Sequence, residues 1–203
     1  MPLKFANNQS LTSTTALPSA VPTDNLILIS TQTASNSANI SFTGINGTYD
    51  AYEFKFIDIH ARTNAVFFSF NLSTDNGSNY NVTKTTTNFT SAHKEDDSDT
   101  TLSYRTNADL AQSTGFQRLG GYTELGSGAD ENMVGNLQLF NPSSTTYVKH
   151  FIAITQTNAN DSYSTASFIA GYGNTTSAVN AVRFQMESGN FDGIIKLYGV
   201  KKS

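Results

Sequence analysis

From Leu26 onward the chain consists of short apolar, β-branched and aromatic segments separated by turn residues. The clearest segment runs from Val66 to Ser73, where Val, Phe, Phe and Leu at even positions alternate with Ser, Asn and Ser at 69, 71 and 73. Such a period of two predicts a half-buried strand. Similar segments predict about nine or ten strands in all, typical of an antiparallel β-sandwich. They cover residues 26–29, 40–42, 49–60, 66–73, 137–140, 147–157, 166–172, 178–187 and 194–200, with a return strand beginning at 80–82.

One predicted strand changes parity along its length. The aromatic residues at 52, 54 and 56 share one face, and the apolar positions then move to Ile57 and Ile59. Because side chains alternate strictly along a strand, this change predicts a β-bulge.

The segment Ser73–Tyr80 has the form of a degenerate Asp-box, Ser-x-Asp-x-Gly-x-x-aromatic. In sialidases and other β proteins this box is a turn scaffold away from the catalytic centre. It predicts a hairpin turn here and gives no support to glycosidase activity.

Two regions lack strand periodicity. Residues 1–24 are rich in Ser, Thr, Asn, Ala and Pro, which predicts an extended N-terminal arm before a single β-sandwich domain at 25–203. Between Ser91 and Gly135 the pattern weakens, and a long excursion is expected there, with one helical turn at Asn107–Gln112. Excursions of that length are usually functional or form interfaces.

Composition narrows the function classes. Charged residues make up 14% of the 203 residues, the formal net charge is −4, and no dense Lys/Arg run is present, which argues against nucleic acid. No apolar run approaches the roughly 18 residues of a membrane span, so we expect no membrane association. No signal peptide is recognisable, so we expect the chain to be synthesised in a host cytoplasm. The absence of Cys excludes disulfides and thiol nucleophiles.

The one weak candidate for a metal site is an acidic segment. Glu95, Asp96, Asp97 and Asp99 place four carboxylates within five positions, and calcium prefers several oxygen ligands. The spacing does not match an EF-hand, so a solvated acidic loop is the alternative. The three histidines, His60, His93 and His150, have no ligand-like spacing, and no zinc site or other cofactor is expected.

No catalytic residues are predicted. The sequence contains no Gly-x-Ser-x-Gly elbow or phosphate loop, and its glutamates are scattered, so we expect a protein that is not an enzyme. Tyr122 and Tyr163 are candidates for glycan or interface contacts, with packing in the core as the alternative.

Four strings carry a family resemblance. They are GTYDAYEFKF at 47–56, the Asp-box-like segment at 73–80, NPSSTTYVKHF at 141–151 and SGNFDGIIKLYGV at 188–200. Together they resemble small structural proteins of marine and cyanobacterial tailed phages, along the whole chain. The resemblance implies a jelly-roll-like sandwich in a virion and no catalytic residues.

Three functions follow as expectations. The first is a tail-fibre or appendage component for host attachment, assembled with itself as a homo-trimer and with other virion proteins, and contacting host surface glycans. The second is a capsid decoration protein held by its N-terminal arm. The third, from another class, is a carbohydrate-binding module or glycan hydrolase.

Overall fold

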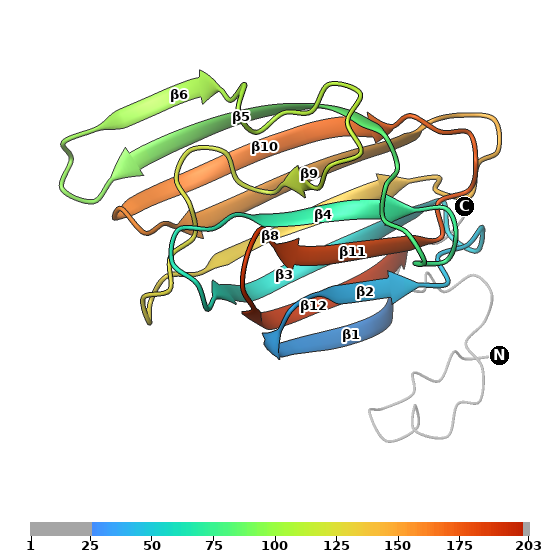
Figure 1. The fold of residues 1–203 in the computed structure, drawn as a ribbon, viewed down its shortest axis with the longest axis horizontal. Helices are drawn as coiled ribbons and strands as arrows, with labels where there is room; N and C mark the ends of the chain where they lie inside the picture. The colour runs from blue at the N-terminus through green and yellow to red at the C-terminus, as the bar shows by residue number, and fades with distance from the viewer. Residues whose placement is uncertain (1–25, 201–203) are drawn as a thin grey trace, which may run out of the picture.

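The computed structural model describes residues 26–200, and these form an all-β structure of twelve strands (Figure 1). The predicted arm at 1–24 lies outside the described residues. The strands are β1 (Leu26–Ser37), β2 (Ile40–Thr43), β3 (Ala51–Ala61), β4 (Phe68–Ser73), β5 (Lys84–Lys94), β6 (Thr100–Tyr104), β7 (Gln117–Arg118), β8 (Met133–Phe140), β9 (Lys149–Asn158), β10 (Tyr163–Gly173), β11 (Ala181–Met186) and β12 (Phe191–Val200).

The strands build two antiparallel sheets packed as a sandwich. The larger sheet has eight strands in the order β1-β12-β3-β8-β9-β10-β5-β6, and the smaller has four in the order β2-β11-β4-β7. Figure 1 shows β2, β11 and β4 of the smaller sheet lying over the β1 to β8 part of the larger one. The smaller sheet also reaches the strands beyond β8, because Phe70 of β4 packs against Phe151 of β9 with ring centroids 5.0 Å apart. The antiparallel β-sandwich expected from the sequence is confirmed.

The pairing of the strands is that of a jelly roll. Eight strands (β1, β2, β3, β4, β7, β8, β11 and β12) form two four-stranded layers, and they pair first with last, second with seventh, third with sixth and fourth with fifth. This is the order that a long folded-over hairpin produces. The other four strands, β9, β10, β5 and β6, continue the larger sheet beyond β8; we call them the extension.

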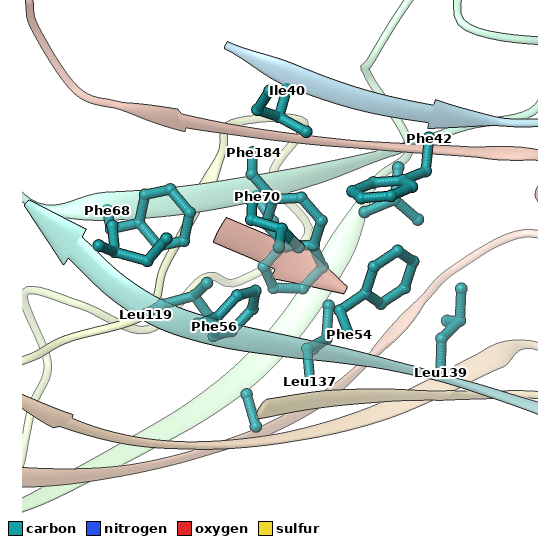
Figure 2. Close-up of a cluster of buried hydrophobic side chains, with 14 of the residues drawn as sticks. Ile40, Phe42, Phe54, Phe56, Phe68, Phe70, Leu119, Leu137, Leu139 and Phe184 are labelled. Carbon is teal, nitrogen blue, oxygen red and sulfur yellow. The ribbon is translucent and has the colours of Figure 1, made fainter. Parts of the chain in front are cut away.

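A cluster of aromatic side chains fills the space between the two layers (Figure 2). Phe184 of β11 lies at its centre, with its ring centroid 5.1 Å from that of Phe54 and 5.2 Å from that of Phe56, both on β3 of the opposite sheet. Edge-to-face geometry at these distances is favourable beyond the area buried. The cluster therefore fastens the smaller sheet to the larger one.

The β-bulge predicted in the third strand is present. The register of β3 shifts between Phe56 and Ile59 against β8, and Asp58 has a positive φ of 50°. Phe56 and Ile59 are consequently both buried although they are three positions apart. The bulge keeps the apolar side chains of a twisted strand directed into the core.

Strand β4 differs from its predicted half-burial, because all six of its residues are buried. Asn71, on the face expected to meet solvent, donates from Nδ2 to the carbonyl oxygens of Tyr80 and Thr114 at 2.7 and 2.9 Å. Segments distant in sequence thus cover the second face, which alternation alone cannot reveal.

The turn at 73–80 forms, but it does not close a hairpin. Ser73 Oγ donates to Asp75 Oδ1 at 2.7 Å, Asp75 accepts from Asn79, and Gly77 has a φ of 88°. The hydrogen bond from the Ser73 side chain, followed by those from Asn79, lowers the pKa of Asp75 to about 2. The strands on either side belong to different sheets, so the turn carries the chain across the sandwich.

The excursion at 91–135 contains more regular structure than expected. It includes the end of β5, all of β6, the short β7 and the start of β8, which raises the count from nine or ten strands to twelve. The helical turn expected at 107–112 is wrong, since the chain forms only a turn at 106–108, where Ala108 N and Asp109 N donate to Arg105 O, and is irregular at 109–112. Thr86 of β5 takes the backbone groups that a helix would use, because its Oγ1 accepts from Leu110 N and its N–H donates to Leu110 O.

Candidate functional site: the outer face of the extension

The inner face of the extension is rich in polar side chains and is covered by the chain itself, although Phe151, Ala153 and Ile169 are also buried on it. Its buried side chains include Thr86, Asn88, Thr90, Thr155, Thr157, Thr165 and Ser167. We call the segment between β6 and β8 (residues 105–132) the covering segment. It is yellow-green in Figure 1 and crosses in front of these strands. Asn88 Nδ2 donates to Gly120 O at 3.1 Å, and Thr155 Oγ1 donates to Leu119 O at 2.5 Å. Buried backbone oxygens of the covering segment are thereby satisfied by strand side chains.

The opposite face carries the large apolar side chains. We call it the outer face, and define it by the outward side chains of the extension (β9, β10, β5 and β6) together with those of the adjoining strand β8. Its exposed large apolar residues are Phe89, Leu102, Tyr104, Val134, Phe140, Ile152, Ile154 and Phe168. An antiparallel sheet normally points its apolar residues inward and its polar ones outward. In the extension most large apolar side chains point outward instead, while Phe151 and Ile169 are buried on the inner face.

Strand register gathers these side chains into one area. Ile154 lies opposite Phe168, Phe168 opposite Phe89, and Phe89 opposite Tyr104, across four successive strands. The rings of Phe89 and Phe168 stack with centroids 4.9 Å apart and planes at 7°. They remain 44% and 37% exposed, so the stack is a projecting apolar feature and not a part of the core.

A groove of about 550 Å³ lies beside the stack. Ala170 and Gly171 of β10 form its small-residue floor, with Phe140, Ile152 and Tyr172 among the residues around it. A smaller hollow of about 210 Å³ follows along the same strand, around Phe89 and Phe168. The two share Thr87, Ile152 and Ala170, so they are parts of one uneven surface.

No Asp, Glu, Lys or Arg lies among the outward side chains of these five strands. The polar positions are Ser, Thr, Asn and Gln, with His93 and His150 near the ends of β5 and β9. Charged side chains border the face on β3, where Lys55 Nζ lies 3.8 Å from Glu53 Oε1, and beside β6, where Asp109 Oδ2 accepts from the Tyr104 hydroxyl at 2.6 Å. An apolar, uncharged area bordered by polar residues is typical of an interaction surface.

Tyr122 and Tyr163, the two tyrosines predicted for contacts, meet each other at Asp99. Both hydroxyls donate to Asp99 Oδ2, at 3.0 and 2.9 Å, and the two rings pack edge to face at 5.2 Å. The bond from Tyr163, and then that from Tyr122, lowers the pKa of Asp99, while the same carboxylate raises the pKa of Tyr163. The cluster ties the covering segment to β10 at one end of the extension.

The other acidic residues have separate local partners. Asp96 accepts from the backbone N–H of Ser98, and Asp97 Oδ1 lies 3.0 Å from His93 Nε2, whereas Glu95 bonds to Ser162 O through its backbone N–H. Among residues 26–200, no group of three or more His, Asp or Glu side chains gathers as a metal site would require. The calcium site stays a prediction.

The three histidines lie in separate places. His60 Nδ1 is 2.7 Å from Glu131 O, His93 contacts Asp97, and the ring of His150 lies 6.0 Å from that of Tyr172.

Within the described part of the chain no helix is long and apolar enough to cross a membrane.

No family model, curated protein or solved structure matches this chain. The candidate site therefore rests on its geometry.

Sequence reasoning missed the outer face. The segment from Lys149 to Asn158 has apolar residues at both parities in its middle, Phe151 and Ala153 on one face and Ile152 and Ile154 on the other. A run of that kind is compatible with burial of either face or of both. The absence of charged outward residues on five strands was the available signal, but it becomes visible only once the strands are placed side by side.

Proposed function

We propose that this chain is a non-enzymatic structural protein of a phage particle, and that it acts by binding through the outer face. The observation that supports binding is that the buried face of the extension is rich in threonine whereas most of its large apolar side chains are exposed on the outer face. Leaving Phe, Ile and Leu side chains in water forgoes about 25 cal/mol for each Å² of apolar surface that could be buried. A partner that covers the face recovers this energy.

The place of the protein on a particle is proposed from the family resemblance. A host-attachment appendage comes first and a capsid decoration protein second. Both designs place many copies on one particle, so a weak single contact gains strength through linked copies. The jelly-roll sandwich suits either design, because its packed layers support the larger sheet that carries the outer face.

Immunogold labelling of purified phage from the source culture tests the proposal. Label at tail tips or fibres is the expected result and supports attachment, whereas regular label over the head supports decoration. Particles without label, in a preparation where an antibody to the major capsid protein does label, would contradict the proposed function.

Host glycans are a second candidate partner, at the Tyr122–Tyr163–Asp99 cluster. The cluster joins two aromatic rings to a carboxylate, and Arg105 stacks over Tyr122 with its guanidinium carbon 4.2 Å from the ring centroid. A glycan array probed with the full chain and with Tyr163→Phe tests this candidate. A signal that Tyr163→Phe leaves unchanged would place glycan binding elsewhere.

A further inference from the structure

The outer face has a projection next to its own hollow. The stacked rings of Phe89 and Phe168 stand beside the groove over Ala170 and Gly171, and both regions are lined by Ile152. A surface of this shape can receive a copy of itself turned by 180°, because each projection then meets the hollow of the other copy. Such a self-complementary contact is the kind made about a two-fold axis.

The charge of the face also favours a second copy. Each chain carries a formal net charge of −4, so two copies repel one another in most orientations. Contact through the outer face buries no Asp, Glu, Lys or Arg from its five strands. The carboxylate of Asp109 lies at the edge of the face, where it accepts a hydrogen bond from the hydroxyl of Tyr104. A strongly charged partner would find no opposite charge on these strands.

The area is sufficient for a stable contact. At about 3.4 Å per residue and 4.8 Å between strands, the five strands present about 700 Å². Specific interfaces of standard size bury about 600–1,000 Å² on each partner, a range that includes this area. Two β-sheets also pack face to face at about 10 Å, with their side chains interdigitated.

We propose that a second copy of this chain covers the outer face, with the two extensions packed face to face about a two-fold axis. The Phe89/Phe168 stack of each copy then enters the groove over Ala170 of the other. The proposal deepens the proposed function, since it names the partner of the same face. It predicts a dimer, whereas the sequence analysis expected a trimer.

The mass of the full chain in solution, measured by sedimentation equilibrium, tests the proposal together with Ile154→Glu. Ile154 is 44% exposed on β9, opposite Phe168 of the stack, and a glutamate there places an unpaired charge in each half of the contact. We expect a dimer for the natural chain, and for the variant a dissociation constant raised by about a hundredfold or more. Leu28→Glu is the matched control, because Leu28 is 52% exposed on β1 at the opposite edge of the same sheet.

Cross-linking gives a second measurement that does not depend on a disruptive variant. The chain contains no Cys, so Thr87→Cys introduces the only thiol, between the groove and the stack. A short bis-maleimide should join two chains through this position, and should not join them through Thr31→Cys on β1, an exposed control.

The outcomes separate clearly. A chain that stays monomeric at about 100 µM, a concentration at which a standard interface is largely formed, would overturn the proposal. So would a dimer that Ile154→Glu leaves intact, because the contact would then lie elsewhere. A trimer would overturn the two-fold arrangement. If the antibody labels particles but the chain is monomeric, only the second-copy proposal is refuted. If the chain is a dimer but particles are not labelled, only the proposed function is refuted.

Discussion

Two lysine side chains are enclosed in the sandwich without a carboxylate as hydrogen-bond partner. Lys84 Nζ donates to Asn71 Oδ1 and to Val82 O, and Lys149 Nζ donates to Tyr147 O at 2.6 Å and to Thr175 O at 3.3 Å. Burial lowers the pKa of both, that of Lys84 to about 7. Neutral oxygens satisfy the amines but offset little of the cost of burying their charge.

Stability should therefore rise with pH above neutrality. Folded Lys84 releases its proton near pH 7, whereas the unfolded chain keeps it up to the ordinary pKa of 10.5. Between these values the unfolded state binds more protons, so the free energy of unfolding increases as the pH rises from about 7 to 10. Urea unfolding across this range measures the slope.

Lys84→Met should reduce this slope, and the double variant with Lys149→Met should flatten it further. Lys55→Met is the control, because the Lys55 side chain is 44% exposed and should leave the slope unchanged. An unchanged slope in the double variant would show that other groups govern the pH dependence.

At the scale of the strands, the bulge in β3 involves both of its neighbours. Gly193 of β12 has a φ of 136°, and Gly135 of β8 has a φ of 156°, each next to the register shift. A Cβ at Gly193 would lie 2.8 Å from Asp58 O and 3.0 Å from Ile59 Cα, both backbone atoms. The parity change in the sequence predicted the bulge, but not the glycines that accommodate it on the adjoining strands.

Gly193→Ala should consequently lower the free energy of unfolding by about 2 kcal/mol or more, through backbone strain and this steric clash. Gly44→Ala is the matched control: Gly44 also has a positive φ, of 75°, but nothing lies within 4 Å of its added Cβ. The free energy of unfolding of this control should fall by only about 1 kcal/mol, the cost of holding an alanine at a positive φ. Equal losses in urea unfolding would mean that the close approach at the bulge relaxes freely.

For the whole molecule, the two halves of the larger sheet are stabilised in different ways. Under the smaller sheet the core is aromatic, and Phe184 contacts rings from both layers, including Phe54 and Phe68. Under the covering segment the buried face is rich in threonine, and the hydrogen bonds to residues 117–120 hold it. The jelly-roll half therefore carries most of the apolar burial.

Phe184→Ala should lower the free energy of unfolding by about 3–5 kcal/mol, because the cavity would open between the two layers. Leu28→Ala, at a side chain that is 52% exposed, should cost well under half as much. Chemical unfolding of both variants provides the comparison. A small loss for Phe184→Ala would mean that the layers repack around the missing ring.

The sequence by itself determined the fold class, most strand positions, the bulge and the turn at 73–80, because alternation, parity and turn residues act over a few neighbouring positions. It placed Tyr122 and Tyr163 among candidate contact residues without indicating that both bond to Asp99, since that meeting depends on how β6, β10 and the covering segment pack. The sequence also could not show that most large apolar side chains of the extension point away from the core.

Only the tertiary structure decided which face of each strand is covered. Alternation identifies the side chains that share a face, but the cover comes from segments far away in the chain. On β4, Asn71 is enclosed by residues 80 and 114. On β5, Asn88 lies under Gly120 while Phe89 on the other side stays exposed. The order of the strands and the return of the covering segment thus leave the apolar outer face open, and that face supports the proposals for function and partner.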